Sequence, residues 1–205
     1  MQWLLLLAWL AAGLFLSGPA RAALPFHNPT LGYTIWLPET WTPAPPPESS
    51  LLQRLCPGLL ADRACRGAAY QARGERTRLL VSELHGRVVA KECIGNFNQF
   101  LVRGLQRRAR DGSSLSQGGG VCLRAARFDP RRNCLRLQLQ AAEPGTGPVT
   151  AIVYIVYTST RMLSLVGLAE PGDDQAVQAI DAAVSTLYLD DGLRQEAAGT
   201  TVFGR

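Results

Sequence analysis

The stretch Ala151-Ile152-Val153-Tyr154-Ile155-Val156-Tyr157 is apolar on both faces of an extended chain. Successive side chains of a strand point to opposite sides, so this run predicts a central strand that is covered on both faces. The neighbouring segments 120–128, 133–142 and 162–169 are also expected to be extended. Together they predict a meander of antiparallel strands in the second half of the chain.

Two helices are expected to flank these strands. Residues 89–110 keep helical spacing. The stripe expected to pack inward comprises Cys93, Phe97, Phe100 and Gly104, with Leu101 and Leu105 beside it. Asp173 and Asp174 indicate the start of the second helix, because acidic side chains favour its positive end. This order of elements predicts the α+β class, with a mainly antiparallel twisted sheet flanked by helices.

The segment 32–38 alternates between apolar and polar faces, which is typical of a half-buried strand. One face carries Tyr33, Ile35 and Leu37, and the other carries Thr34 and Trp36.

Trp36 and Trp41 are candidate contact residues, because aromatic side chains are favoured at the centres of protein interfaces. A place in the hydrophobic core is the alternative for both.

The chain has 205 residues, 47% of them hydrophobic and 18% charged, which suits one domain with a core and excludes wholesale disorder.

Residues 4–16 are almost wholly apolar, and Ala20-Arg21-Ala22 supplies the small residues of a cleavage site. We expect a signal peptide over 1–22 with cleavage after Ala22, a single α+β domain over 23–190 and a flexible C-terminal tail over 191–205. An uncleaved anchor is the alternative for 1–22. After cleavage we expect no integral membrane span and a periplasmic or secreted protein.

The formal net charge is +5, and nearly all of the positive charge is carried by arginine. Guanidinium groups pair with carboxylate and phosphate groups. Arg103 and Arg107 lie four residues apart on the expected helix and share a face, which makes them candidate interface residues. No aromatic residues alternate with the arginines, and export separates the protein from nucleic acid, so a nucleic-acid partner is not expected.

Exported proteins meet an oxidising compartment, so disulfides are expected, although five cysteines leave at least one unpaired within the chain. Cys56 and Cys65 close a small loop and are the candidate disulfide. Cys122 and Cys134 lie on consecutive expected strands. In the register we expect, Cys134 lies opposite Ala126, too far from Cys122 for a disulfide.

Cys93 and His85 are the one pair that could act as a nucleophile and its base. No sequence around them resembles a cysteine hydrolase. Cys93 could instead pair with Cys122 or Cys134 across the sheet. His27 and His85 are isolated, so metal-ligand spacing is absent. We therefore expect no catalytic, metal-binding or cofactor-binding residues.

The stretch Tyr33-Thr34-Ile35-Trp36-Leu37-Pro38-Glu39-Thr40-Trp41 resembles the opening of PsbP/DcrB-like domains, with an alternating strand, a proline, a turn and a tryptophan. The segments 151–157, 162–169 and 174–187 are similar, in order, to the back half of that family. The resemblance covers most of 26–190, and segment 51–69 departs from it. It implies an α/β/α sandwich that works mostly by binding, often in exported accessory or assembly subunits of larger complexes. It implies no shared catalytic residues.

These observations predict an exported, non-enzymatic binding or assembly module of a bacterial cell envelope, with an envelope protein or complex as its partner. Two alternatives remain open. One is a thiol-dependent enzyme that uses Cys93 with His85. The other is a carrier of a small ligand or lipid, with a pocket between a helix and the sheet.

Overall fold

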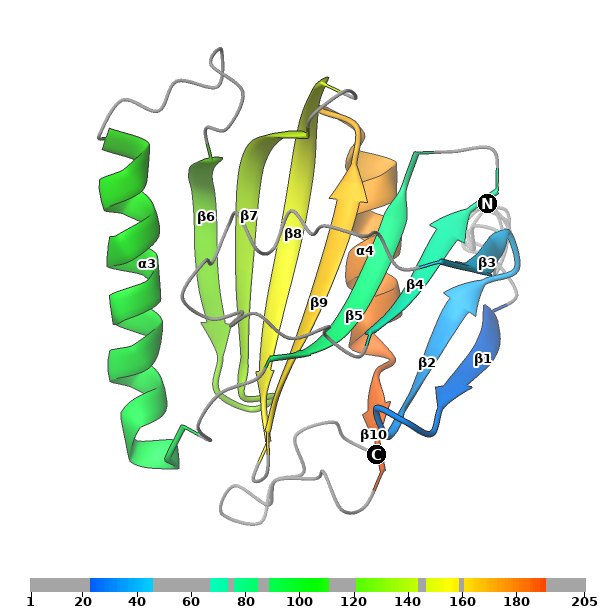
Figure 1. Ribbon diagram of the computed structural model, residues 1–205, viewed down its shortest axis with the longest axis horizontal. Helices are drawn as coiled ribbons and strands as arrows, with labels where there is room; N and C mark the ends of the chain where they lie inside the picture. The colour runs from blue at the N-terminus through cyan, green and yellow to red at the C-terminus, as the bar shows by residue number, and fades with distance from the viewer. Residues whose placement is uncertain are drawn as a thin grey trace, which may run out of the picture.

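A computed structural model describes residues 23–45, 67–73, 76–84, 89–110, 121–143, 147–158 and 161–190. Within these residues the chain forms two antiparallel sheets and two α-helices (Figure 1). The predicted signal peptide over 1–22 and the predicted tail over 191–205 lie outside the described residues, as do Cys56 and Cys65. For those segments the expectations remain predictions.

The larger sheet has seven strands in the order β3-β4-β5-β9-β8-β7-β6 (Figure 1). Their bounds are β3 Trp41–Ala44, β4 Gly67–Ala72, β5 Arg78–Leu84, β6 Val121–Asp129, β7 Cys134–Glu143, β8 Gly147–Tyr157 and β9 Met162–Ala169. Every side chain of 151–157 in β8 is buried, and β8 lies between β9 and β7. The predicted central strand is therefore confirmed, with both faces covered.

The smaller sheet has three strands in the order β1-β2-β10, with β1 at Ala23–Asn28, β2 at Tyr33–Pro38 and β10 at Tyr188–Leu189. The alternation predicted for β2 is confirmed, because Tyr33, Ile35 and Leu37 are all buried. The division into two sheets was not predicted. It arises because the chain turns at residues 39–40 and passes from β2 into β3 of the larger sheet, while β10 pairs with β2 from the far end of the domain.

The helices lie on opposite faces of the larger sheet. Helix α3 (Ile94–Arg110) follows the short helix η1 (Lys91–Cys93) and packs near β6 (Figure 1). Helix α4 (Asp174–Ser185) shares the other face with the smaller sheet. Its start is capped by Asp173, whose Oδ1 accepts a hydrogen bond from the Ala176 N–H at 2.9 Å. The fold is α+β, with the layers of an α/β/α sandwich and a small second sheet in one of them.

The inward stripe predicted for α3 is wrong for three of its four members, whereas Leu101 and Leu105 beside it do pack against the sheet. Phe100 is 73% exposed, and Cys93 and Gly104 are also exposed. Asn98 lies on the inner face instead, where it is buried and its Oδ1 accepts a hydrogen bond from the Tyr157 hydroxyl on β8. The side chains that pack against the sheet are Ile94, Phe97, Leu101 and Leu105.

The β6–β7 hairpin differs from the expected register. Cys134 lies opposite Asp129, and Ala126 lies opposite Leu137, so the prediction that paired Cys134 with Ala126 is wrong. The turn holds residues 130–133 and ends at Asn133, which has a positive φ of 45°. A bulge between 123 and 125 shifts the pairing once more.

The described cysteines Cys93, Cys122 and Cys134 are free thiols. Cys122 pairs with Gln140 across the hairpin, at the opposite end of β7 from Cys134. The two thiols are therefore separated as expected, although through a different register. Cys93 is exposed and forms no disulfide with either of them.

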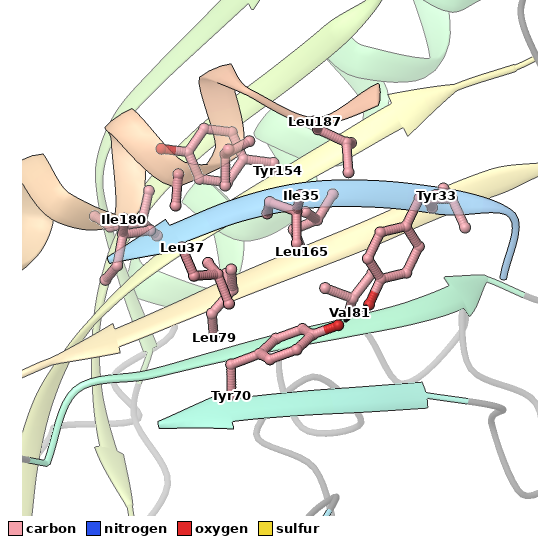
Figure 2. Close-up of a cluster of buried hydrophobic side chains, with 14 of the residues drawn as sticks. Tyr33, Ile35, Leu37, Tyr70, Leu79, Val81, Tyr154, Leu165, Ile180 and Leu187 are labelled. Carbon is pink, nitrogen blue, oxygen red and sulfur yellow. Dashed lines mark hydrogen bonds between the residues drawn. The ribbon is translucent and has the colours of Figure 1, made fainter. Parts of the chain in front are cut away.

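Two hydrophobic cores lie on the two faces of the larger sheet. Figure 2 shows the core on the α4 side, where Ile35 and Leu37 of β2 pack near Leu79 and Leu165 of the larger sheet. Two buried tyrosines, Tyr33 and Tyr70, join the sheets at one end of this core, with their hydroxyl oxygens 2.9 Å apart. The smaller sheet is thus held by apolar packing and by a buried polar contact.

Candidate binding surfaces

The outer face of the smaller sheet carries two exposed aromatic side chains. Trp36 of β2 and Tyr188 of β10 are each 37% exposed. Tyr188 lies directly opposite Thr34, so it shares a face with Thr34 and Trp36. We call this the outer sheet face and define it by Pro25, His27, Thr34, Trp36 and Tyr188.

The backbone beneath Trp36 is held in place on both sides. The Trp36 N–H donates to Thr186 Oγ1 at 3.0 Å, just after the end of α4. On the inner side, Ile35 and Leu37 are fully buried. The indole therefore stands on a rigid strand that is fixed by contacts on its other face.

Trp41 is only 3% exposed and belongs to the core on the α4 side. Of the two alternatives for this residue, the structure places it in the core, where it cannot meet a partner. Its position follows from the turn at residues 39–40, which leads the chain into β3 with Trp41 facing inward.

Arg103 and Arg107 are both exposed on α3, and their role as interface residues stays a prediction. With Asn96, Gln99 and Phe100 they line a shallow groove of about 270 Å³. This groove and the outer sheet face belong to layers on opposite faces of the larger sheet. The predicted interface residues are therefore not brought together into one surface.

A second pocket, of about 380 Å³, lies where the β6–β7 hairpin meets the C-terminal half of α4. We call it the hairpin pocket. Its lining residues are Arg127, Asp129, Arg132, Cys134, Arg136, Tyr154, Asp181, Val184 and Ser185. The sequence did not predict it, because the arginines converge only through the observed hairpin register.

A network of polar contacts forms one wall of the hairpin pocket. Arg136 donates two hydrogen bonds to Asp181, from Nε to Oδ1 at 2.9 Å and from Nη2 to Oδ2 at 3.0 Å. Tyr154 extends from β8 toward α4 (Figure 2), and its hydroxyl donates to Asp181 Oδ1. The carboxylate on α4 thereby fixes Arg136 in a planar, two-point geometry.

Cys134 forms part of the pocket's floor. Burial, and secondly the nearby Asp129 carboxylate, raises the pKa of its thiol to about 12. A thiol reacts as a nucleophile or binds a metal only as the thiolate, so Cys134 stays protonated and unreactive near neutral pH.

The suggested contact between Cys93 and His85 stays a prediction, because His85 lies outside the described residues. Cys93 itself is an exposed free thiol beside the start of α3. Among the described residues, no three His, Cys, Asp or Glu side chains are grouped so that they could hold a metal ion. No helix in the described part of the chain is long and apolar enough to cross a membrane.

The fold is that of an α+β protein, with an exposed aromatic pair on one sheet, a shallow groove on α3 and a pocket beside α4. No protein family and no curated protein matches the chain. Several solved structures are similar to it, among them the following three. One is the crystal structure of a protein from Bacteroides thetaiotaomicron, with 12% identity and a TM-score of 0.44 over 83% of this chain. The present chain spans 50% of that protein's length.

The second structure is the solution structure of cyanobacterial PsbP (CyanoP) from Synechocystis sp. PCC 6803, with 10% identity, a TM-score of 0.45 and coverage of 84% of this chain and 96% of that one. The third is LpqN, involved in cell envelope biogenesis of Mycobacterium tuberculosis, with 11% identity, a TM-score of 0.38 and coverage of 82% and 91%. The α+β fold described above, with its mostly antiparallel sheets and two α-helices, is the fold that the resemblance to PsbP-like domains implies.

Proposed function

We propose that this chain is an exported, non-enzymatic binding or assembly module of a bacterial cell envelope, and that a protein partner docks on the outer sheet face. The observation that carries the proposal is the exposure of Trp36 and Tyr188 on the same face of neighbouring strands, in diagonal positions. Export is proposed from the apolar stretch 4–16 and the small residues at 20–22.

An exposed aromatic pair on a rigid strand is suited to protein recognition. Tryptophan and tyrosine are enriched among the residues that dominate binding energy, because they bury a large area and lose little conformational freedom. Trp36 meets that requirement, since Thr186 and the core fix its backbone. Around it, Pro25, His27 and Thr34 supply a mixed apolar and polar rim.

Site-specific photo-cross-linking tests this surface in the native envelope. A photoreactive amino acid placed at position 36 is expected to give one discrete protein adduct. The matched control places it at Phe100, which is more exposed but lies on α3. Adducts of equal yield from both positions, or none from position 36, would contradict the proposal.

The Trp36→Ala variant is expected to bind that partner about 30-fold more weakly, as for a typical interface hot spot. Its free energy of unfolding should fall by only about 1 kcal/mol or less, because the side chain is partly exposed. Affinity is measured by titration with the free, purified form of the partner that cross-linking identifies. Stability is measured by urea unfolding. Phe100→Ala is the control that should keep full affinity. If Trp36→Ala unfolds the domain, Trp36 belongs to the core.

A further inference from the structure

The hairpin pocket holds more positive charge than its acidic groups neutralise. Arg127 and Arg136 are direct cross-strand partners, so their side chains leave the same face of the hairpin. Arg136 is paired with Asp181. Within the part of the chain that the structure describes, no carboxylate lies within ion-pair distance of Arg127.

The third arginine of the pocket is only loosely held. Arg132 Nε lies 3.9 Å from Asp129 Oδ2, and both side chains are nearly half exposed. That carboxylate is engaged elsewhere, because its Oδ1 accepts hydrogen bonds from the backbone N–H groups of Arg131 and Arg132. Arg132 is therefore able to turn toward a bound anion.

Like charges directly opposite each other destabilise a pair of strands. The hairpin nevertheless places Arg127 opposite Arg136 and leaves a hollow beside them. An anion in that hollow would relieve the repulsion. The guanidinium fork of Arg127 suits it, because it presents paired N–H donors to the two oxygens of a carboxylate or phosphate. Arg136 uses Nε and Nη2 for Asp181 and would donate to the anion from Nη1.

The other walls limit what the ligand can be. A volume of about 380 Å³ is near the lower end for small-molecule sites. Cys134, Val184 and the ring of Tyr154 offer an uncharged surface beside the arginines. Asp129 and Asp181 would repel a second anionic group.

We propose that the hairpin pocket binds a small molecule, or the exposed part of a larger one, through a single carboxylate or phosphate group held by Arg127 and Arg136. Arg132 closes on the same group from the turn. The body of the ligand lies against Cys134, Val184 and Tyr154. The site shares no residue with the outer sheet face. The experiments below therefore test this proposal independently of the protein-docking proposal.

Thermal unfolding of the full chain tests the proposal with inorganic phosphate and acetate as probes. A ligand that binds only the folded state raises Tm along a saturation curve. We expect such a curve for at least one probe, and a much smaller rise with sodium chloride at matched ionic strength. Equal rises with the probes and with chloride would overturn the proposal, because they would show general screening of charge.

Variants of Arg127 separate a binding role from a structural one. Arg127→Gln is expected to weaken the probe about tenfold, in line with the loss of one charge-assisted contact. Without probe its Tm should be unchanged or slightly higher, since the repulsion from Arg136 is removed. Arg127→Lys keeps the charge but not the forked guanidinium group. Its affinity for the probe should lie between those of the unaltered protein and Arg127→Gln. An Arg127→Gln variant with a lower Tm and an unchanged response to phosphate would refute a binding role.

The matched control is Arg78→Gln, which removes the same charge from an exposed position on β5 and should leave the response intact. Trp36→Ala, on the outer sheet face, should also leave the rise of Tm with the probe unchanged. The source of the anion is distinguished with phosphatidylcholine vesicles that contain or lack phosphatidylglycerol. Sedimentation with the anionic vesicles that depends on Arg127 would identify a lipid headgroup. A response to phosphate without sedimentation would identify a soluble ligand.

Discussion

The Ile180→Ala variant is expected to lose about 3–4 kcal/mol of unfolding free energy, as for other large truncations in a core. Ile180 is fully buried and is the point at which α4 rests on the larger sheet (Figure 2). Gly167 on β9 is what permits the close approach, since a Cβ at that position would lie 2.4 Å from the Ile180 Cγ2 atom. The measurement is urea unfolding followed by far-UV circular dichroism.

A double-mutant cycle checks that the contact itself is responsible. Gly167→Ala alone should cost about 1–3 kcal/mol, because the added methyl overpacks the contact with Ile180. In the double variant, the new methyl partly fills the space left by isoleucine, so its cost should fall below the sum of the single costs. Strict additivity would show that the helix does not rest on Gly167. Gln178→Ala, at an exposed position of α4, should change stability by less than about 0.5 kcal/mol.

Above about pH 10 the domain is expected to lose stability steeply, by as much as about 1.4 kcal/mol per pH unit for each buried tyrosine that contributes. Burial raises the pKa of Tyr33, Tyr70 and Tyr157 above the ordinary value of 10.0. The unfolded chain loses these protons near pH 10, whereas the folded chain retains them. The buried, protonated tyrosines therefore contribute their full share to the free energy of unfolding below about pH 10. This contribution is lost as the pH rises through the pKa values of the folded state.

Urea unfolding at a series of pH values from neutral to strongly alkaline measures this slope. Tyr33→Phe should cost about 1 kcal/mol at neutral pH, because the Tyr70 hydroxyl loses its partner. Above pH 10 the same variant should show a shallower slope than the unaltered protein. Leu37→Val is the control, because it weakens the same core without removing a titratable group. It should lower stability equally at all pH values, and an equally shallow slope in that variant would contradict the explanation.

The sequence pattern was sufficient to predict burial where it depends only on the position of a residue within its own strand or helix. The run 151–157 and the alternation in β2 were predicted because burial on two faces, or on one, leaves a direct trace in the sequence. The acidic start of α4 was predicted for a similar reason, since Asp173 caps a backbone N–H only three residues away.

Longer-range contacts were not predicted, because single residues override the pattern. The hairpin register depends on the positive φ of Asn133 and on a bulge near 124. The inner face of α3 includes the polar side chain of Asn98, which is bonded to Tyr157, and leaves out the apolar Phe100, so hydrophobic spacing alone selects the wrong face. The hairpin pocket was missed for the same reason, since its arginines meet only in the true register.

The smaller sheet also determines the order in which the domain can fold. Its middle strand, β2, is among the first described segments to be synthesised, and its partner β10 is the last. The hydrogen bond from Trp36 to Thr186 spans 150 residues of chain. Contacts between residues so distant in sequence slow folding, because the intervening chain must be ordered first. Until β10 has been synthesised, the edge of β2 that it covers stays unpaired and is open to pairing with the wrong strand.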